Sequence, residues 1–145
     1  MNIFIDTSSL IKLYYKEDGT SKLDRIFVEH KVAAIFISEI TKVEFFSAIY
    51  KKLRIGQLSQ QNVDDILDLF LIDLHNYEVV LMNSEIINLS QILIKKYGTK
   101  GLRALDGMQL ASVCSMKGII DMAITDDKLL NEFFVSENVK IPALL

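Results

Sequence analysis

The chain begins with MNIFIDTSSL (1–10), in which a short apolar run reaches a carboxylate and then stops. Residues 2–5 have the length and composition of a strand that is buried on both faces. Asp6 comes at the carboxyl end of that strand, and Thr7 or Ser8 is available as the N-cap of a helix over 7–16. Asp6 therefore either belongs to the start of this helix or holds a ligand.

The rest of the chain alternates between short apolar runs and segments of helical period. The runs 32–38, 77–82 and 121–125 are predicted strands, and 139–141 is a predicted edge strand. Predicted helices cover 39–54, 59–75, 84–97, 103–117 and 127–134. In the first of these, Ile40, Val43, Phe46, Tyr50 and Leu53 form the expected apolar stripe. The pattern predicts an α/β fold of three layers, with a central, mostly parallel sheet of four to five strands.

Composition limits the possible classes of protein. Half of the 145 residues are apolar, with only one Pro and six Gly, so we expect a single domain over 1–145. No segment is both long and apolar enough to span a bilayer, and the start of the chain lacks the basic region of a cleaved signal. The single cysteine, Cys114, is typical of a reducing compartment, which predicts a cytoplasmic protein.

The net charge of −3 argues against a protein that coats nucleic acid by electrostatics. It leaves open an enzyme that grips nucleic acid locally and keeps its acids in one pocket.

Several acids occur where a lone carboxylate is costly. Glu44 borders the apolar face of helix 39–54, and Asp106 has Leu110 and Val113 on its stripe. Asp126 and Asp127 follow strand 121–125 and so share a sheet edge with Asp6.

Each acid has a structural explanation of its own. These are a capping role for Asp6, Asp126 and Asp127, a first-turn dipole interaction for Asp106, and a tolerated half-buried position for Glu44. Together, however, several converging carboxylates repel one another unless a proton or a cation separates them. Ligation by oxygen alone suits Mg²⁺ or Mn²⁺.

Four stretches in this order, IFIDTSSLIKLY, SEITKVEFFSAIYK, LRALDGMQLASV and AITDDKLL, resemble the PIN-domain family along nearly the whole chain. The resemblance is strongest to the VapC-type toxins of toxin–antitoxin pairs. It implies that Asp6, Glu44, Asp106 and Asp127 are the catalytic and metal-binding acids. Ser8 and Thr125 match supporting polar positions, and Asp126 fills a variable position beside them. Gly107 and Gln109 depart from the family pattern, which often has Ala and His there, and we expect neither to touch the four acids.

The resemblance implies a metal-dependent endoribonuclease, in which the ion generates a hydroxide and neutralises charge on the phosphate. His30, His75 and Cys114 lie outside the motifs, and no base lies near Ser8, so a serine hydrolase is not expected.

Basic residues near the acids are candidates for contacts with RNA. The stretch KKYGTKGLR (95–103) supplies Lys96, Lys100 and Arg103, with Lys12 as a weaker candidate. The alternative is a solvated helix end whose lysines interact with the helix dipole.

The resemblance also implies an antitoxin partner and a homodimer. The principal alternative is a non-catalytic PIN-like module that binds RNA or protein. A phosphotransfer receiver would need its acid pair near the first strand, and a structure-specific DNA nuclease would need a clamp that this chain lacks.

Overall fold

The computed structural model describes residues 1–143. In chain order its strands are β1 (Asn2–Ile5), β2 (Ala34–Ser38), β3 (Tyr77–Val80) and β4 (Met122–Ile124). The α-helices are α1 (Thr7–Leu10), α2 (Thr20–Glu29), α3 (Thr41–Arg54), α4 (Gln60–Asp73), α5 (Ser84–Tyr97), α6 (Ala104–Ser115) and α7 (Lys128–Ser136). Short 3₁₀ helices are η1 (Ile11–Leu13), η2 (Leu74–Asn76) and η3 (Gly98–Lys100). Among the helices described, none is both long and apolar enough to cross a bilayer.

The four strands form one parallel sheet in the order β3-β2-β1-β4. Ile3 pairs with Ile35 of β2, and Phe4 pairs with Ala123 of β4. The chain moves from β1 outward through β2 to β3, and it then returns to the other side of β1 for β4. The sheet therefore has a topological switch point between the carboxyl ends of β1 and β4, which is where open α/β sheets bind ligands.

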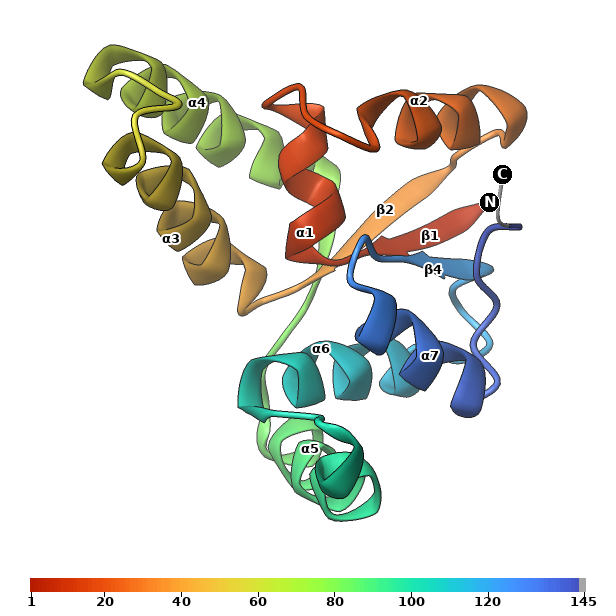
Figure 1. Cartoon of the computed structure of the whole chain (residues 1–145). Helices are drawn as coiled ribbons and strands as arrows, with labels where there is room; N and C mark the ends of the chain where they lie inside the picture. Colours follow the sequence, from red (N-terminus) through yellow and green to blue (C-terminus); the bar gives the residue numbers. More distant parts are fainter. Residues whose placement is uncertain (144–145) are drawn as a thin grey trace.

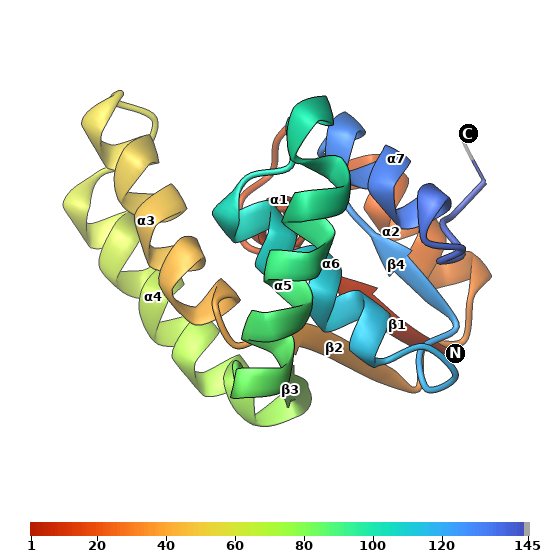
Figure 2. The same cartoon turned by 90° about the horizontal axis from the view of Figure 1, so that it is seen from below.

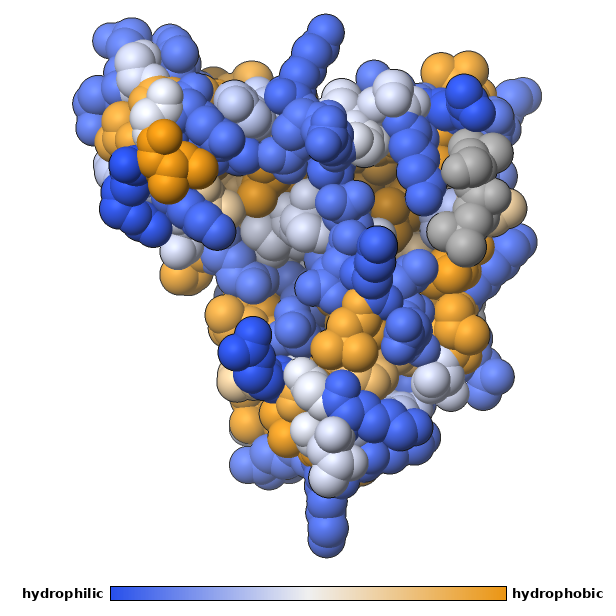
Figure 3. Space-filling view, viewed as in Figure 1, coloured by the Kyte–Doolittle hydropathy of each residue, from blue (hydrophilic) through white to orange (hydrophobic). Residues whose placement is uncertain are grey.

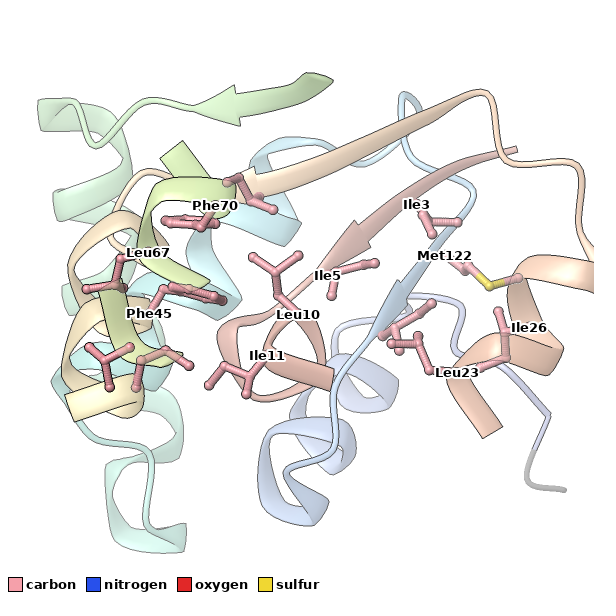
Figure 4. Packing of buried hydrophobic residues seen from close by; sticks show 14 residues of the cluster. Ile3, Ile5, Leu10, Ile11, Leu23, Ile26, Phe45, Leu67, Phe70 and Met122 are labelled. Atoms are coloured by element: carbon pink, nitrogen blue, oxygen red, sulfur yellow. The ribbon is translucent and has the colours of Figure 1, made fainter. Parts of the chain in front are cut away.

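Helices cover both faces of the sheet, so the predicted three-layer α/β architecture is confirmed (Figures 1 and 2). Side chains alternate between the two faces along each strand. Ile3, Ile5 and Met122 join a core with residues of α1 to α4, as Figure 4 shows. Phe4 and Ala123 join a second core with residues of α5, α6 and α7. β1 and β4 are buried on both sides, which explains their continuous apolar runs, whereas the edge strand β3 exposes Glu78.

Two predictions about the elements are wrong. Residues 139–141 form no strand; the segment is joined to the sheet edge by a hydrogen bond from the Ala123 N–H to the Lys140 carbonyl at 2.9 Å. The apolar stripe of α3 is also different. Val43 is 74% exposed, whereas Phe45 is fully buried and stacks on Phe70 of α4 with ring centroids 3.9 Å apart. Packing against α4 selects the face that carries Phe45.

Candidate functional site

The site lies at the switch point, where β1 ends before Asp6 and β4 ends before Thr125. The backbone N–H of Asp6 donates to the Ile124 carbonyl at 3.1 Å, which fixes the two strand ends side by side. Figure 1 shows α1 directly after β1, between the pair α3 and α4 and helix α2, with α5, α6 and α7 on the other side of the sheet. Hydrophilic residues predominate over the centre of this face (Figure 3).

Asp6 is a buried carboxylate held by several donors. Its Oδ1 accepts from the Ser9 N–H at 3.0 Å, which makes Asp6 itself the N-cap of α1 in place of Thr7 or Ser8. The Ser8 hydroxyl donates to Oδ1 at 2.9 Å and lies 3.0 Å from Oδ2. The Thr125 hydroxyl donates to Oδ2 at 2.8 Å. The carboxylate is therefore fixed from both strand ends, and only 5% of the residue is exposed.

Burial raises the pKa of Asp6 to about 6, although its hydrogen bonds to Ser9, Thr125 and Ser8 oppose the shift. The nearby charge of Glu44 contributes to the increase. Capping accounts for the helix start, but it does not explain why the cap is a buried acid next to another acid. The structure confirms that Asp6 belongs to the start of α1, and its role in holding a ligand stays a prediction.

Glu44 accepts hydrogen bonds from two neutral donors at one of its carboxylate oxygens. Gln109 Nε2 donates to its Oε1 at 2.7 Å, and the Thr7 hydroxyl donates to the same oxygen at 2.9 Å. The expectation that Gln109 touches none of the four acids is wrong. The sequence offered a signal for this contact, because Gln109 is a polar residue inside the apolar run of α6. In the structure, Gln109 is only 2% exposed. Thr7 gave no comparable signal.

Glu44, Asp106 and Asp127 differ in burial, and Asp127 is the most exposed of the three. Burial raises the pKa of Glu44, and the charge of Asp106 adds to the increase. Burial also raises the pKa of Asp106, with a further contribution from the charge of Asp127. Asp127 is exposed and caps α7 by accepting from the Leu130 N–H at 2.8 Å. Asp6 and Glu44, Glu44 and Asp106, and Asp106 and Asp127 therefore influence one another electrostatically in pairs, from buried Asp6 to exposed Asp127.

The chemistry of this acidic group fits a hard divalent cation, because its donors are carboxylate oxygens and the nearby side chains are neutral hydroxyls and an amide. In their present positions, no three His, Cys, Asp or Glu side chains within residues 1–143 are close enough to surround an ion. A closed ring is not required for Mg²⁺, which usually keeps several waters and binds one or two protein carboxylates.

Asp126 supports the site differently from Ser8 and Thr125. Its backbone N–H donates to the Ser8 hydroxyl at 3.1 Å, and its carboxylate forms an ion pair with Lys12 at 3.1 Å. Lys12 also pairs with Glu17 at 3.4 Å and donates to the Asp18 carbonyl, and its side chain is only 5% exposed. These contacts tie the loop after β4 to the loop before α2. The ammonium group of Lys12 would have to leave its partners to reach a phosphate, so its RNA contact stays a prediction.

The other basic candidates lie at the α5–α6 connection. Arg103 is exposed at the N-cap position of α6, and its charge opposes the increase in the pKa of Asp106. Lys100 is exposed in η3. Lys96 pairs with Glu137 at 2.6 Å. Glu137 follows the C-terminus of α7, whereas Asp127 caps its N-terminus. The RNA contacts of Arg103, Lys100 and Lys96 stay predictions.

Gly107 has a packing role between α5 and α6. A Cβ at this position would lie 2.9 Å from Cγ1 of Ile94, so the glycine permits the close approach of the two helices. This contact sets the position of the α6 turn that carries Asp106 and Gln109.

Comparison with known proteins agrees with this arrangement. The sequence profile of the PIN domain matches residues 3–133. The chain belongs to the PIN domain family. No curated protein matches it significantly by sequence.

Solved structures share the fold of this PIN domain. The toxin VapC20 from Mycobacterium tuberculosis, described as cleaving the sarcin–ricin loop, superposes with a TM-score of 0.67 at 16% identity, covering 90% of this chain and 93% of VapC20. VapBC2 from Rickettsia felis, bound to a DNA fragment from its promoter, gives a TM-score of 0.64 at 16% identity, covering 98% of both chains. At this level of identity the comparison establishes a common fold.

Proposed function

We propose that this PIN domain is a metal-dependent endoribonuclease that hydrolyses RNA phosphodiester bonds. Asp6, Glu44, Asp106 and Asp127 are its proposed catalytic and metal-binding residues, and Mg²⁺ or Mn²⁺ is its proposed ion. The observation that carries the proposal is the buried carboxylate of Asp6 at the switch point, whose pKa is raised to about 6 and which neighbours a second acid. At neutral pH such a group is stabilised by a cation.

The residues of the proposed site have different roles. A bound divalent ion would supply a more acidic water and would neutralise charge on the phosphate. Ser8, Ser9 and Thr125 keep Asp6 in one orientation, so the carboxylate does not have to be ordered when the ion binds. Asp106 and Asp127 are the acids closer to solvent, where an RNA backbone would enter.

RNA must approach an acidic site, so local positive charge is needed beside it. Arg103 is the best-placed candidate because its charge already acts on Asp106. Lys100 lies three residues before it in the exposed η3 segment. These side chains would contact phosphates and orient the strand without reading its sequence.

We further infer that the chain is the toxin of a toxin–antitoxin pair, with a cognate antitoxin and a homodimer as its assemblies. The support is the fold shared with VapC20 and VapBC2 over at least 90% of this chain. Exposed apolar side chains on α4, with Leu69 at 50% and Ile72 at 65%, offer surface for such a contact.

The test uses the purified chain with end-labelled RNA, with Mn²⁺ and with a chelator. Cleavage that requires Mn²⁺, is lost in Asp6→Asn and persists in Asp24→Asn supports the proposal. Asp24 is the matched control because it is an exposed acid on α2. Cleavage that survives Asp6→Asn or the chelator would contradict the proposal.

A further inference from the structure

Gln109 is a buried amide whose contacts are unevenly distributed. Its Nε2 faces three acceptors: Glu44 Oε1 at 2.7 Å, the Thr41 hydroxyl at 3.0 Å and the Thr7 hydroxyl at 3.2 Å. Its Oε1 is buried and accepts no hydrogen bond from any described residue. An unpaired buried carbonyl is unfavourable, and an aliphatic side chain of the same size would avoid that cost. The benefit of this glutamine therefore lies on its Nε2 side, at Glu44.

The two oxygens of Glu44 have different surroundings. Oε1 receives the donors from Gln109 and Thr7. Among residues 1–143, Oε2 takes part in no hydrogen bond or ion pair that the structure records. An amide is also a neutral donor, so it holds the carboxylate without cancelling the charge that a cation needs. Lysine at this position would neutralise Glu44.

We propose that Gln109 is a positioning residue that, together with Thr7, holds Oε1 of Glu44 and leaves Oε2 for a divalent cation. The inference rests on the proposed metal site and extends it to a residue that contacts the ligand rather than the ion. Groups that orient metal ligands in this way typically change metal affinity about 10–100-fold when they are removed.

The test is Mn²⁺ binding to the full chain by isothermal titration calorimetry. Gln109→Met keeps the side-chain length and removes the donor, and we expect about tenfold weaker Mn²⁺ binding. Gln109→Asn keeps a buried amide but withdraws it by one methylene, so it should weaken binding similarly. Thermal unfolding of the metal-free chains shows whether each variant folds. If Gln109→Met does not fold, the Mn²⁺ affinity of Gln109→Asn tests the proposal.

Ser112→Ala is the matched control. Ser112 is another buried polar residue of α6, but its hydroxyl donates to the Met108 carbonyl at 2.8 Å and lies 2.9 Å from the Ser38 hydroxyl. It should bind Mn²⁺ like the wild type. Weaker binding in this control, equal to that of Gln109→Met, would mean that general disturbance of α6 causes the loss.

A double-mutant cycle with Glu44→Gln separates positioning from a general structural role. If Gln109 acts through Glu44, adding Gln109→Met to Glu44→Gln causes little further loss of Mn²⁺ affinity. Fully additive losses, or wild-type affinity in Gln109→Met, would overturn the inference while leaving the metal site in place. Absence of Mn²⁺ binding by the wild-type chain would overturn the proposed function and this inference together.

Discussion

The acidic group has a buried half and an exposed half. Asp6 is 5% exposed and receives donors from a backbone amide and two hydroxyls, while Asp127 is exposed and caps a helix. Glu44 and Asp106 lie between them as half-buried residues. The contrast suggests that the buried half holds an ion in a fixed place, while the exposed half meets the substrate. The predictions below test that division.

The largest difference is expected between the two ends of the group. Asp6→Asn should weaken Mn²⁺ binding about 100-fold, because it removes a preoriented carboxylate from a desolvated position. Asp127→Asn should weaken it about tenfold, since asparagine still caps α7 and the position is hydrated. Calorimetric titration measures both. Equal losses at the two positions would remove the distinction between a buried and an exposed half.

The free energy of unfolding of the metal-free protein should depend on pH through the protonation of Asp6. Because its pKa is about 6 in the folded chain and lower in the unfolded chain, the folded state binds more protons between pH 4 and pH 6. The contribution of Asp6 to the free energy of unfolding should therefore fall by about 2 kcal/mol as the pH rises from 4 to 7.

Other carboxyl groups also change the stability with pH, so the comparison is between wild type and Asp6→Asn. Burial opposes the shift at Glu17 and Glu137, but their lysine partners lower both pKa values, and their contributions to stability change in the opposite direction. Urea unfolding at pH 7 should find Asp6→Asn more stable than the metal-free wild type. A less stable variant would mean that the donors around Asp6 outweigh its desolvation.

Metal binding should weaken in acid for the same reason. An ion binds the ionised carboxylate, so Mn²⁺ affinity should fall about tenfold between pH 7 and pH 5 as Asp6 takes up a proton. Asp6→Asn should show a shallower dependence. Affinity that does not change with pH in the wild type would argue against Asp6 as a ligand.

The smallest effect concerns the exposed side of the site. Arg103→Gln should weaken RNA binding about threefold and reduce the salt dependence of that binding by about one charge. Asp106 should remain in place, so the Mn²⁺ affinity should change little. Arg25→Gln, an exposed position on α2, is the control in a filter-binding assay with uncleavable RNA. Similar losses in both variants would indicate a nonspecific charge effect.

The four strands of the sheet could be predicted because buried strands leave a local signal in the sequence. The apolar run of β1 reflects burial on two faces, and Asp6 follows directly after it. The face of α3 was predicted incorrectly because Val43 and Tyr50 fit the helical period as well as Phe45 and Ile49 do. Only contact with α4 decides between the two faces.

The partners of the acids depend on contacts between distant segments. Gln109 and Thr7 are 102 residues apart, and both reach Glu44 only after α1, α3 and α6 have packed. Lys12 likewise meets Asp126 across the loops next to α1 and β4. Spacing along the chain cannot specify such contacts.

The central claim is that a divalent cation binds at the switch point against Asp6. Anomalous diffraction from crystals grown with Mn²⁺ tests it most directly. The account predicts a strong peak within about 2.5 Å of a carboxylate oxygen of Asp6, with further ligands from the neighbouring acids. A peak elsewhere, or none at Asp6 when the protein binds Mn²⁺ in solution, would contradict it.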